Sequence, residues 1–214
     1  MKAAFFEDDE LTASLLAGGT WSANRDLPDV VKWVDLMSFP SEVLPILRSR
    51  LDASTAPGAT QQFPIPKEGA GSQRSVTISD PYDELIYRCL TGRIVTAIDN
   101  TLGDEVKSYR LSSPAPGWRF RHYRYGDGER REDGLRFIES GMFGAFGVMD
   151  VRQYYPSISI AGLAAVLDRI GAPSCDVTAL VTYLQDWVEV WGRTGASHRL
   201  RVFWGSGKRH AGAA

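Results

Sequence analysis

Residues 146–158 of the chain read FGVMDVRQYYPSI. The apolar run over 145–151 predicts a buried strand that delivers one carboxylate, Asp150, at its end. Pro156 then predicts the start of a helix that ends at Gly171. A carboxylate in this place is suited to hold Mg²⁺, which prefers oxygen ligands and shares them with phosphates. The alternative interpretation is that Asp150 only ends a strand and caps a helix. For an isolated Asp, capping is the commoner role.

A second informative segment, FPIPK, covers residues 63–67. Its two prolines force the chain along an extended path. Gly69 and Gly71 indicate a turn, and residues 74–78 have the composition of a strand. Together these signals predict a β-hairpin.

The clearest helix is predicted over residues 80–102, where apolar side chains recur at the spacing of one helix face. Asp80 is a natural N-cap beside Pro81, and Gly103 is a natural end. The other predicted elements are a short strand over 106–111, a loop over 114–128, and helices over 129–143 and 175–191.

The composition is that of an ordinary globular protein. The 214 residues include 24 basic and 26 acidic side chains, for a formal net charge of −2, and 43 % of the residues are hydrophobic. This balance excludes a disordered tail and a protein that binds nucleic acid by bulk charge alone. Two cysteines are too few for a disulfide framework. We find no targeting or membrane-spanning segment and expect a cytoplasmic protein that does not contact a membrane.

The segment 146–158 as a whole resembles the first catalytic motif of reverse transcriptases, especially the bacterial enzymes related to retrons, group II introns and phage defence. The positions that match this motif are Asp150, Val151, Tyr154, Tyr155, Pro156, Ser157 and Ile158. The predicted hairpin resembles the fingers hairpin of the same family, and residues 78–85 resemble its junction between strand and helix. Residues 108–111, with Trp118 and Phe120 after them, are similar to the stretch before the palm. The resemblance covers about residues 60–170.

The resemblance implies an α+β fold with reverse-transcriptase-like fingers, a partial palm and an N-terminal helical region. The helical region is expected over residues 1–52. The reverse-transcriptase-like domain is expected over 60–214 and is expected to be truncated at its C-terminus.

The resemblance also implies a role for each matching residue. Asp150 would ligate two Mg²⁺ ions, and Val151 would offer its backbone carbonyl to one of them. Tyr155 would lie under the sugar and exclude a 2′-hydroxyl group by steric contact. Lys67 and Arg74 would neutralise the charge of the incoming triphosphate.

The implied activity is that of an RNA-directed DNA polymerase that transfers nucleotides from a dNTP to the 3′-hydroxyl of a DNA or RNA primer on an RNA template. The family also uses a second acidic motif, Tyr-x-Asp-Asp, and the residues after Asp150 do not contain it. We therefore expect a truncated or frameshifted chain that is inactive alone, and the competing account is a natural short partner protein. A second polypeptide could supply the missing palm. The alternatives are a non-catalytic nucleic-acid-binding module and an inert fragment.

One further segment is basic and aromatic. Its arginines, Arg119, Arg121 and Arg124, lie among Trp118, Tyr123 and Tyr125. Such a pattern could contact a nucleic-acid strand by charge and stacking, and a solvated loop is an equally good interpretation.

Overall fold

The structure is a computed structural model, and it describes residues 6–18, 35–58, 60–66, 73–113, 117–121, 123–142, 147 and 158–193. The helices are α1 (Asp8–Gly18), α3 (Pro40–Asp52), α4 (Pro81–Thr101), α5 (Tyr123–Glu139), α7 (Ile160–Arg169) and α8 (Ser174–Arg193). The strands are β1 (Gln61–Pro66), β2 (Gln73–Ile78), β3 (Leu111–Ser113) and β4 (Arg119–Phe120). The protein is therefore of mixed α and β structure with helices in the majority, as the sequence predicts at this level.

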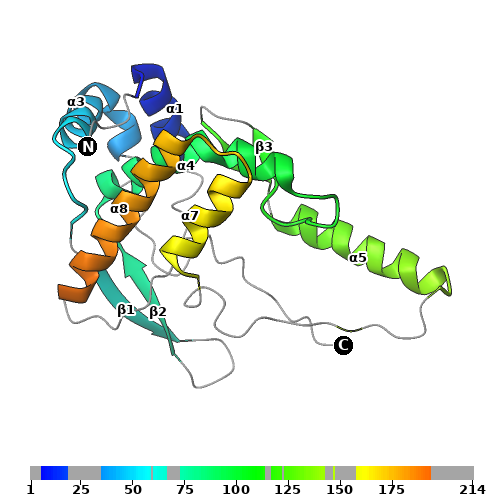
Figure 1. Ribbon diagram of the computed structural model, residues 1–214. Helices are drawn as coiled ribbons and strands as arrows, with labels where there is room; N and C mark the ends of the chain where they lie inside the picture. The colour runs from blue at the N-terminus through cyan, green and yellow to red at the C-terminus, as the bar shows by residue number, and fades with distance from the viewer. Residues whose placement is uncertain are drawn as a thin grey trace.

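Helix α4 lies at the centre of the described structure (Figure 1). Helices α1, α3 and α8 all pack against it, and α7 packs against α8. The side chains that these helices bury form one hydrophobic core, which includes Phe6, Leu11, Leu15, Val43, Leu47, Leu85, Ile86, Cys89, Leu90, Ile94, Leu167, Leu180 and Leu184. Helices from both ends of the chain thus share a single core with α4.

The predicted hairpin is confirmed. Strands β1 and β2 pair antiparallel, and their register places Phe63 opposite Val76 and Ile65 opposite Arg74. Figure 1 shows this hairpin extending away from the helices on the side of α8. The predicted glycine turn, at 69 and 71, lies outside the described residues.

The predicted helix over 80–102 is confirmed as α4, including its N-cap. The Asp80 side chain accepts a hydrogen bond from the Tyr82 amide at 2.8 Å, and Pro81 occupies the first turn, where a missing N–H costs nothing. The helix ends at Thr101, because Leu102 is extended. Its buried residues include the unbroken run 88–92, so α4 is buried on more than one face, as a helix at the centre of the core must be.

The prediction of a loop over 114–128 is wrong, because α5 already begins at Tyr123. Two glycines make this region look like a loop in the sequence, yet Gly126 serves the contact between α5 and the preceding segment. A Cβ atom at Gly126 would lie only 2.2 Å from the Lys107 carbonyl oxygen, so no larger residue fits this approach. The strand predicted over 106–111 is also displaced, since β3 begins at Leu111 and pairs with β4.

Helix α5 projects away from the rest of the described structure (Figure 1). It ends at Glu139 rather than at residue 143, and Gly141 follows with a φ of +64°, a conformation that glycine adopts without strain. Several of the large apolar side chains at its far end are exposed: Leu135, Phe137, Ile138 and Met142.

The two C-terminal helices agree with the sequence. Helix α7 is capped by Ser159, whose hydroxyl accepts a hydrogen bond from the Gly162 amide at 2.9 Å, and it ends before Gly171. It begins at Ile160, later than the predicted start at Pro156, because Ile158 and the N-cap Ser159 are not helical. Pro156 itself lies outside the described residues. Helix α8 covers the predicted range of 175–191. None of the described helices combines the length and the apolar character that crossing a bilayer requires.

Candidate functional site

The junction between β2 and α4 is the best-defined part of the candidate site. Strand β2 ends at Ile78, and Asp80 caps α4 directly afterwards. The Ser79 hydroxyl lies 2.6 Å from a carboxylate oxygen of Glu84 and donates a hydrogen bond to it, which fixes the turn between strand and helix. This junction corresponds to residues 78–85, for which the sequence predicts a passage from strand to helix.

A cluster of charged side chains adjoins this junction, with Asp83 buried and Arg50 and Asp80 partly exposed. Arg50, near the end of α3, places its Nη1 atom 3.1 Å from Oδ1 of Asp83 and 3.3 Å from Oδ1 of Asp80. The other carboxylate oxygen of Asp83 accepts a hydrogen bond from the Gly58 amide at 2.7 Å. From α8, the Tyr183 hydroxyl donates to the backbone carbonyl of Asp83 at 3.3 Å. The cluster therefore joins α3, the segment before β1, α4 and α8.

Asp83 is only 2 % exposed, and its environment alters its proton affinity. Burial raises the pKa of its carboxyl, and the negative charge of Asp80 adds to this rise. The Gly58 amide, the Arg50 guanidinium and the Tyr183 hydroxyl act in the opposite direction without cancelling it. Burial likewise raises the pKa of Tyr183 well above its usual range, which keeps its hydroxyl a hydrogen-bond donor.

The resemblance assigns Lys67 and Arg74 to the triphosphate, and of these two the structure describes only Arg74. Arg74 lies in β2 opposite Ile65, on the strand that leads into α4. Lys67 follows the last residue of β1 and lies outside the described residues.

The residues that the resemblance assigns to chemistry, Asp150, Val151 and Tyr155, also lie outside the described residues. They belong to the segment between the end of α5 and Ser159, the N-cap of α7. Of the strand predicted over 145–151, Gly147 alone is described, and it is in neither a helix nor a strand.

The resemblance implies magnesium, and the described residues alone do not provide a site for it. In the part of the chain that the structure describes, no three side chains of His, Cys, Asp or Glu gather as metal ligands would. Asp80 and Asp83 lie close together, but both face the Arg50 guanidinium, whose positive charge opposes a cation. The fit of magnesium to this protein therefore depends on Asp150 and Val151.

The aromatic side chains of the basic and aromatic segment differ in exposure, because Tyr125 is exposed on α5 whereas Trp118 is buried. Trp118 is only 2 % exposed, and its ring lies under the Arg88 guanidinium, with 4.5 Å between the Arg88 Cζ atom and the ring centroid. Its indole N–H donates to the Arg88 carbonyl at 3.2 Å, and Phe120 packs edge-on against it. Burial lowers the pKa of Arg88 to about 10. Trp118 therefore belongs to the interior and cannot stack on a base. The interpretation of this segment as a solvated loop is wrong, since β4 and α5 occupy it.

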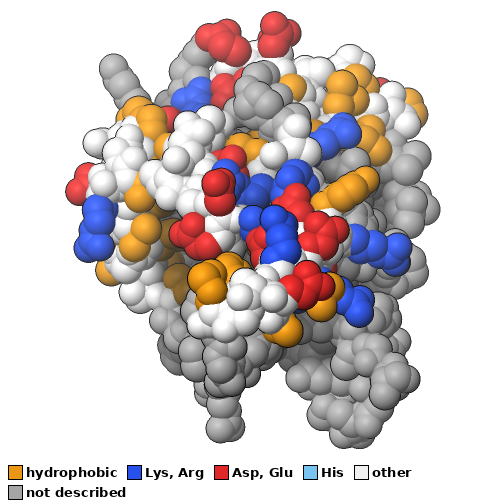
Figure 2. Space-filling view, turned by 90° about the vertical axis from the view of Figure 1, so that its right-hand side faces the viewer, with side chains coloured by type: hydrophobic (Ala, Val, Ile, Leu, Met, Phe, Trp, Pro, Cys, Tyr) orange, Lys and Arg blue, Asp and Glu red, His pale blue; other side chains and the backbone are white. Residues whose placement is uncertain are grey.

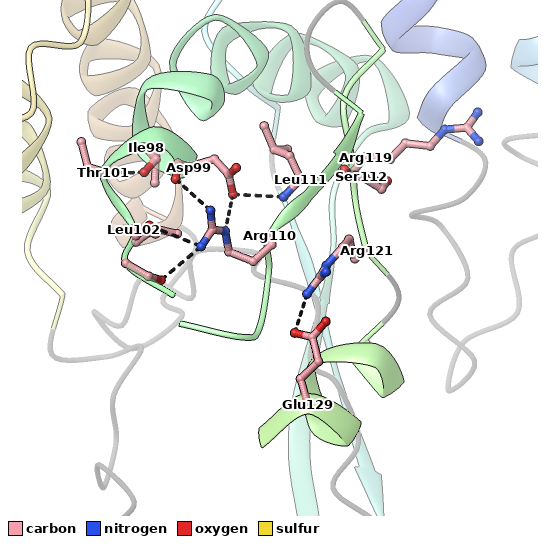
Figure 3. A network of polar contacts seen from close by, with 11 residues as sticks. Ile98, Asp99, Thr101, Leu102, Arg110, Leu111, Ser112, Arg119, Arg121 and Glu129 are labelled. Carbon is pink, nitrogen blue, oxygen red and sulfur yellow. Dashed lines mark hydrogen bonds and ion pairs between the residues drawn. The ribbon is translucent and has the colours of Figure 1, made fainter. Parts of the chain in front are cut away.

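Arg121 and Arg119 differ in their surroundings. Arg121 pairs with Glu129 of α5 at 2.8 Å. The Arg119 side chain instead points away from the polar contacts drawn in Figure 3. On the face shown in Figure 2, basic and acidic side chains are intermixed and hydrophobic side chains lie among them. Among its described residues, this face therefore lacks the separate positive patch that surfaces binding a nucleic-acid backbone usually have.

Sequence reasoning missed the polar network that closes the C-terminal end of α4 (Figure 3). Arg110 pairs with Asp99 at 2.9 Å and donates to the carbonyls of Leu102 and Gly103 at 3.3 and 3.1 Å. The Leu111 amide donates to the same Asp99 carboxylate at 3.1 Å. The positive charge of the Arg110 guanidinium is favourable at the negative end of the helix dipole. Its N–H groups also donate to carbonyls that have no hydrogen-bond donor within the helix. The network thereby fastens the β3–β4 hairpin to α4.

Comparison of the chain with known protein families, with curated proteins and with solved structures finds no match. The assignment of function therefore depends on the sequence motifs and on the geometry described above.

Proposed function

We propose that the chain carries the fingers and the first part of the palm of an RNA-directed DNA polymerase of the reverse transcriptase type. The observation that carries the proposal is the arrangement around β2. A proline-rich strand pairs with a strand that bears Arg74, and this second strand leads at once into the capped start of α4. The fingers of that family are expected to have this order of elements, and the Asp150 motif follows at the expected distance along the chain.

The proposed reaction joins the primer to an incoming nucleotide. The primer 3′-hydroxyl oxygen forms a bond to the α-phosphorus of a dNTP, and the bond from that phosphorus to the leaving pyrophosphate breaks. Lys67 and Arg74 would bind the triphosphate, whose negative charge they offset. Tyr155 would contact the sugar and leave no room for a 2′-hydroxyl group. Asp150 and the Val151 carbonyl would hold Mg²⁺, which when bound stabilises negative charge on the reacting oxygens.

The second acidic motif is a separate requirement. The sequence after Asp150 contains no Tyr-x-Asp-Asp string, so a single carboxylate is left to hold the metal. We therefore propose that a second polypeptide supplies the missing acids. The same observation favours a second candidate, a nucleic-acid-binding module that retains the fingers without the chemistry.

A primer-extension assay tests the proposal, with the chain purified under mild conditions from the cells that naturally produce it, so that a second polypeptide that supplies the missing acids stays bound. The assay follows labelled dNTP incorporation on an RNA template with an annealed DNA primer, with Mg²⁺ present. Asp150→Ala is the test variant, and Asp168→Ala on the exposed side of α7 is the control. Incorporation that is lost in the first variant and kept in the second would support the polymerase. A chain that binds the template–primer duplex in a salt-sensitive way but incorporates nothing would support the binding module instead.

A further inference from the structure

We propose that Arg50 of α3 is a positioning residue that clamps both ends of the β1–β2 hairpin. The clamp itself follows from geometry alone. Its consequence for nucleotide binding rests on the function proposed above, because Lys67 and Arg74 belong to this hairpin.

Both ends of the hairpin are linked to the Arg50 guanidinium, one directly and the other through Asp83. Asp80 lies two residues after the end of β2, and its Oδ1 atom lies 3.3 Å from Arg50 Nη1. Gly58 comes shortly before β1, and its amide donates to Asp83 Oδ2 at 2.7 Å. The other oxygen of Asp83 lies 3.1 Å from the same Arg50 Nη1 atom. Arg50 therefore holds the downstream end of the hairpin directly and the upstream end through Asp83.

Burial makes this clamp more than a surface ion pair. The side chain of Asp83 is 3 % exposed, and that of Arg50 is 29 % exposed. The Arg50 guanidinium also lies over the Tyr82 ring, 4.9 Å from its centroid. A buried carboxylate that loses its cationic partner is left uncompensated, which is far more costly than breaking a pair in water. Arg50 thus contributes to the structure at the base of the hairpin and not only to solubility.

The hairpin needs such an anchor. Within the described part of the chain, β1 and β2 pair only with each other. A two-stranded hairpin alone is marginally stable in water, so its order and direction must come from what holds its base. The group that holds the base comes from α3, which lies in the N-terminal helical region. The N-terminal region therefore sets the position of the strand that bears Arg74.

Hydrogen–deuterium exchange measured by mass spectrometry tests the clamp without any assumption about activity. The test variants are Arg50→Met, which keeps an unbranched flexible stem but removes the charged guanidinium, and Asp83→Asn. The matched control is Arg48→Met on the same helix, because Arg48 pairs with Asp8 of α1 and donates to the Phe6 carbonyl. We expect the amides of residues 61–66 and 73–78 to exchange at least about tenfold faster in Arg50→Met, while the amides of α8 keep their wild-type rates.

A milder variant guards against loss of the whole fold. Asp80→Ser retains a good helix N-cap and removes only the acid that pairs with Arg50. It should accelerate exchange in the hairpin by a smaller factor than Arg50→Met. Wild-type exchange in the hairpin of both a folded Arg50→Met variant and Asp80→Ser would overturn the proposal, as would equal acceleration in Arg48→Met.

The functional consequence has its own readout. If the chain polymerises, Arg50→Met should raise the KM for dNTP severalfold and leave kcat nearly unchanged, because the hairpin binds the nucleotide and does not perform the chemistry. A chain that lacks activity but shows the faster exchange would retain the clamp and lose the proposed function. An active chain whose hairpin exchange and KM are unaffected by Arg50→Met would retain the function and lose the clamp.

Discussion

At the scale of single residues, Asp83 is the group whose protonation most affects the structure. Burial raises its pKa, and the groups that face it are Arg50 from α3, Asp80 before α4 and Tyr183 from α8. The folded protein therefore binds the proton of the Asp83 carboxyl group more tightly than the unfolded chain does. As a result, the contribution of Asp83 to the free energy of unfolding is fully present at pH values below the pKa of Asp83 in the unfolded chain. That contribution falls as the pH rises through the raised folded pKa.

Asp83→Asn should therefore change how stability depends on pH. Asp83→Asn removes this titration. The free energy of unfolding of the wild type should therefore decrease relative to that of the variant as the pH rises from below to well above the ordinary pKa of an aspartate. Urea denaturation at a series of pH values measures the difference. A difference that is constant across this range would show that Asp83 titrates equally in the folded and unfolded states.

The two cysteines should differ sharply in reactivity. Cys89 is buried on α4, and burial raises the pKa of its thiol to about 11, whereas Cys175 is exposed at the start of α8. The thiolate is the reactive form, so a thiol reagent near pH 8 should label Cys175 rapidly and Cys89 only slowly in the folded protein. Addition of denaturant should make both react. Two equally fast thiols in the folded protein would contradict the burial of Cys89.

At the scale of elements, the contact between α5 and Lys107 should determine how α5 is held. Gly126→Ala would place a Cβ atom 2.2 Å from the Lys107 carbonyl oxygen, so the backbone must move, at a cost of about 1–3 kcal/mol. Gly128→Ala is the matched control, because a Cβ atom there would meet no neighbouring part of the described chain within 4 Å. Alanine in place of this glycine favours the helix by about 1 kcal/mol. Chemical denaturation should show opposite signs for the two variants. Stabilisation by both would mean that α5 does not approach residue 107 closely.

The elements differ in how well the sequence predicts them, and the reasons are local. The β1–β2 hairpin and α4 are predictable because prolines fix an extended path in one and an Asp–Pro cap marks the start of the other. Helix α5 begins earlier than the sequence predicts, because its glycines suggest a turn and it buries little apolar surface. The cluster at Arg50 could not be predicted, since its Arg50–Asp83 pair joins residues 33 positions apart. Asp83 lies in the segment 78–85 that resembles a strand-to-helix junction, but that resemblance gives Asp83 no charged partner. The resemblance that suggests Asp150, Val151, Tyr155 and Lys67 remains a prediction.

At the scale of the whole molecule, α1 belongs to the same core as α4 and α8. Leu15 is fully buried in that core, and Arg93 of α4 pairs with both Glu10 of α1 and Asp176 of α8 at 2.9 and 3.2 Å. The N-terminal helices are therefore expected to be part of one cooperative unit with the rest of the described helices.

Two neighbouring leucines on α1 test this expectation. Leu15→Ala should lower the free energy of unfolding of the whole protein by about 2–5 kcal/mol, because it leaves a cavity in the shared core. Leu16→Ala, at an exposed position on the same helix, should change it by less than about 0.5 kcal/mol. The far-ultraviolet circular dichroism signal during denaturation reports on all helices together. A separate early transition in Leu15→Ala, with the main transition unchanged, would show that α1 unfolds on its own.

Helix α4 carries one hairpin at each end: the Asp80 junction holds β1–β2 at its start, and Arg110 fastens β3–β4 at its finish. Its 21 residues, at about 1.5 Å of rise each, keep these attachments about 30 Å apart. A helix in this position therefore fixes the distance between the two hairpins. Adding or removing a single residue within it would turn one hairpin by about 100° about the helix axis relative to the other, whatever the side chain involved. The length of α4, more than the chemistry of its exposed face, sets the relative orientation of the two hairpins.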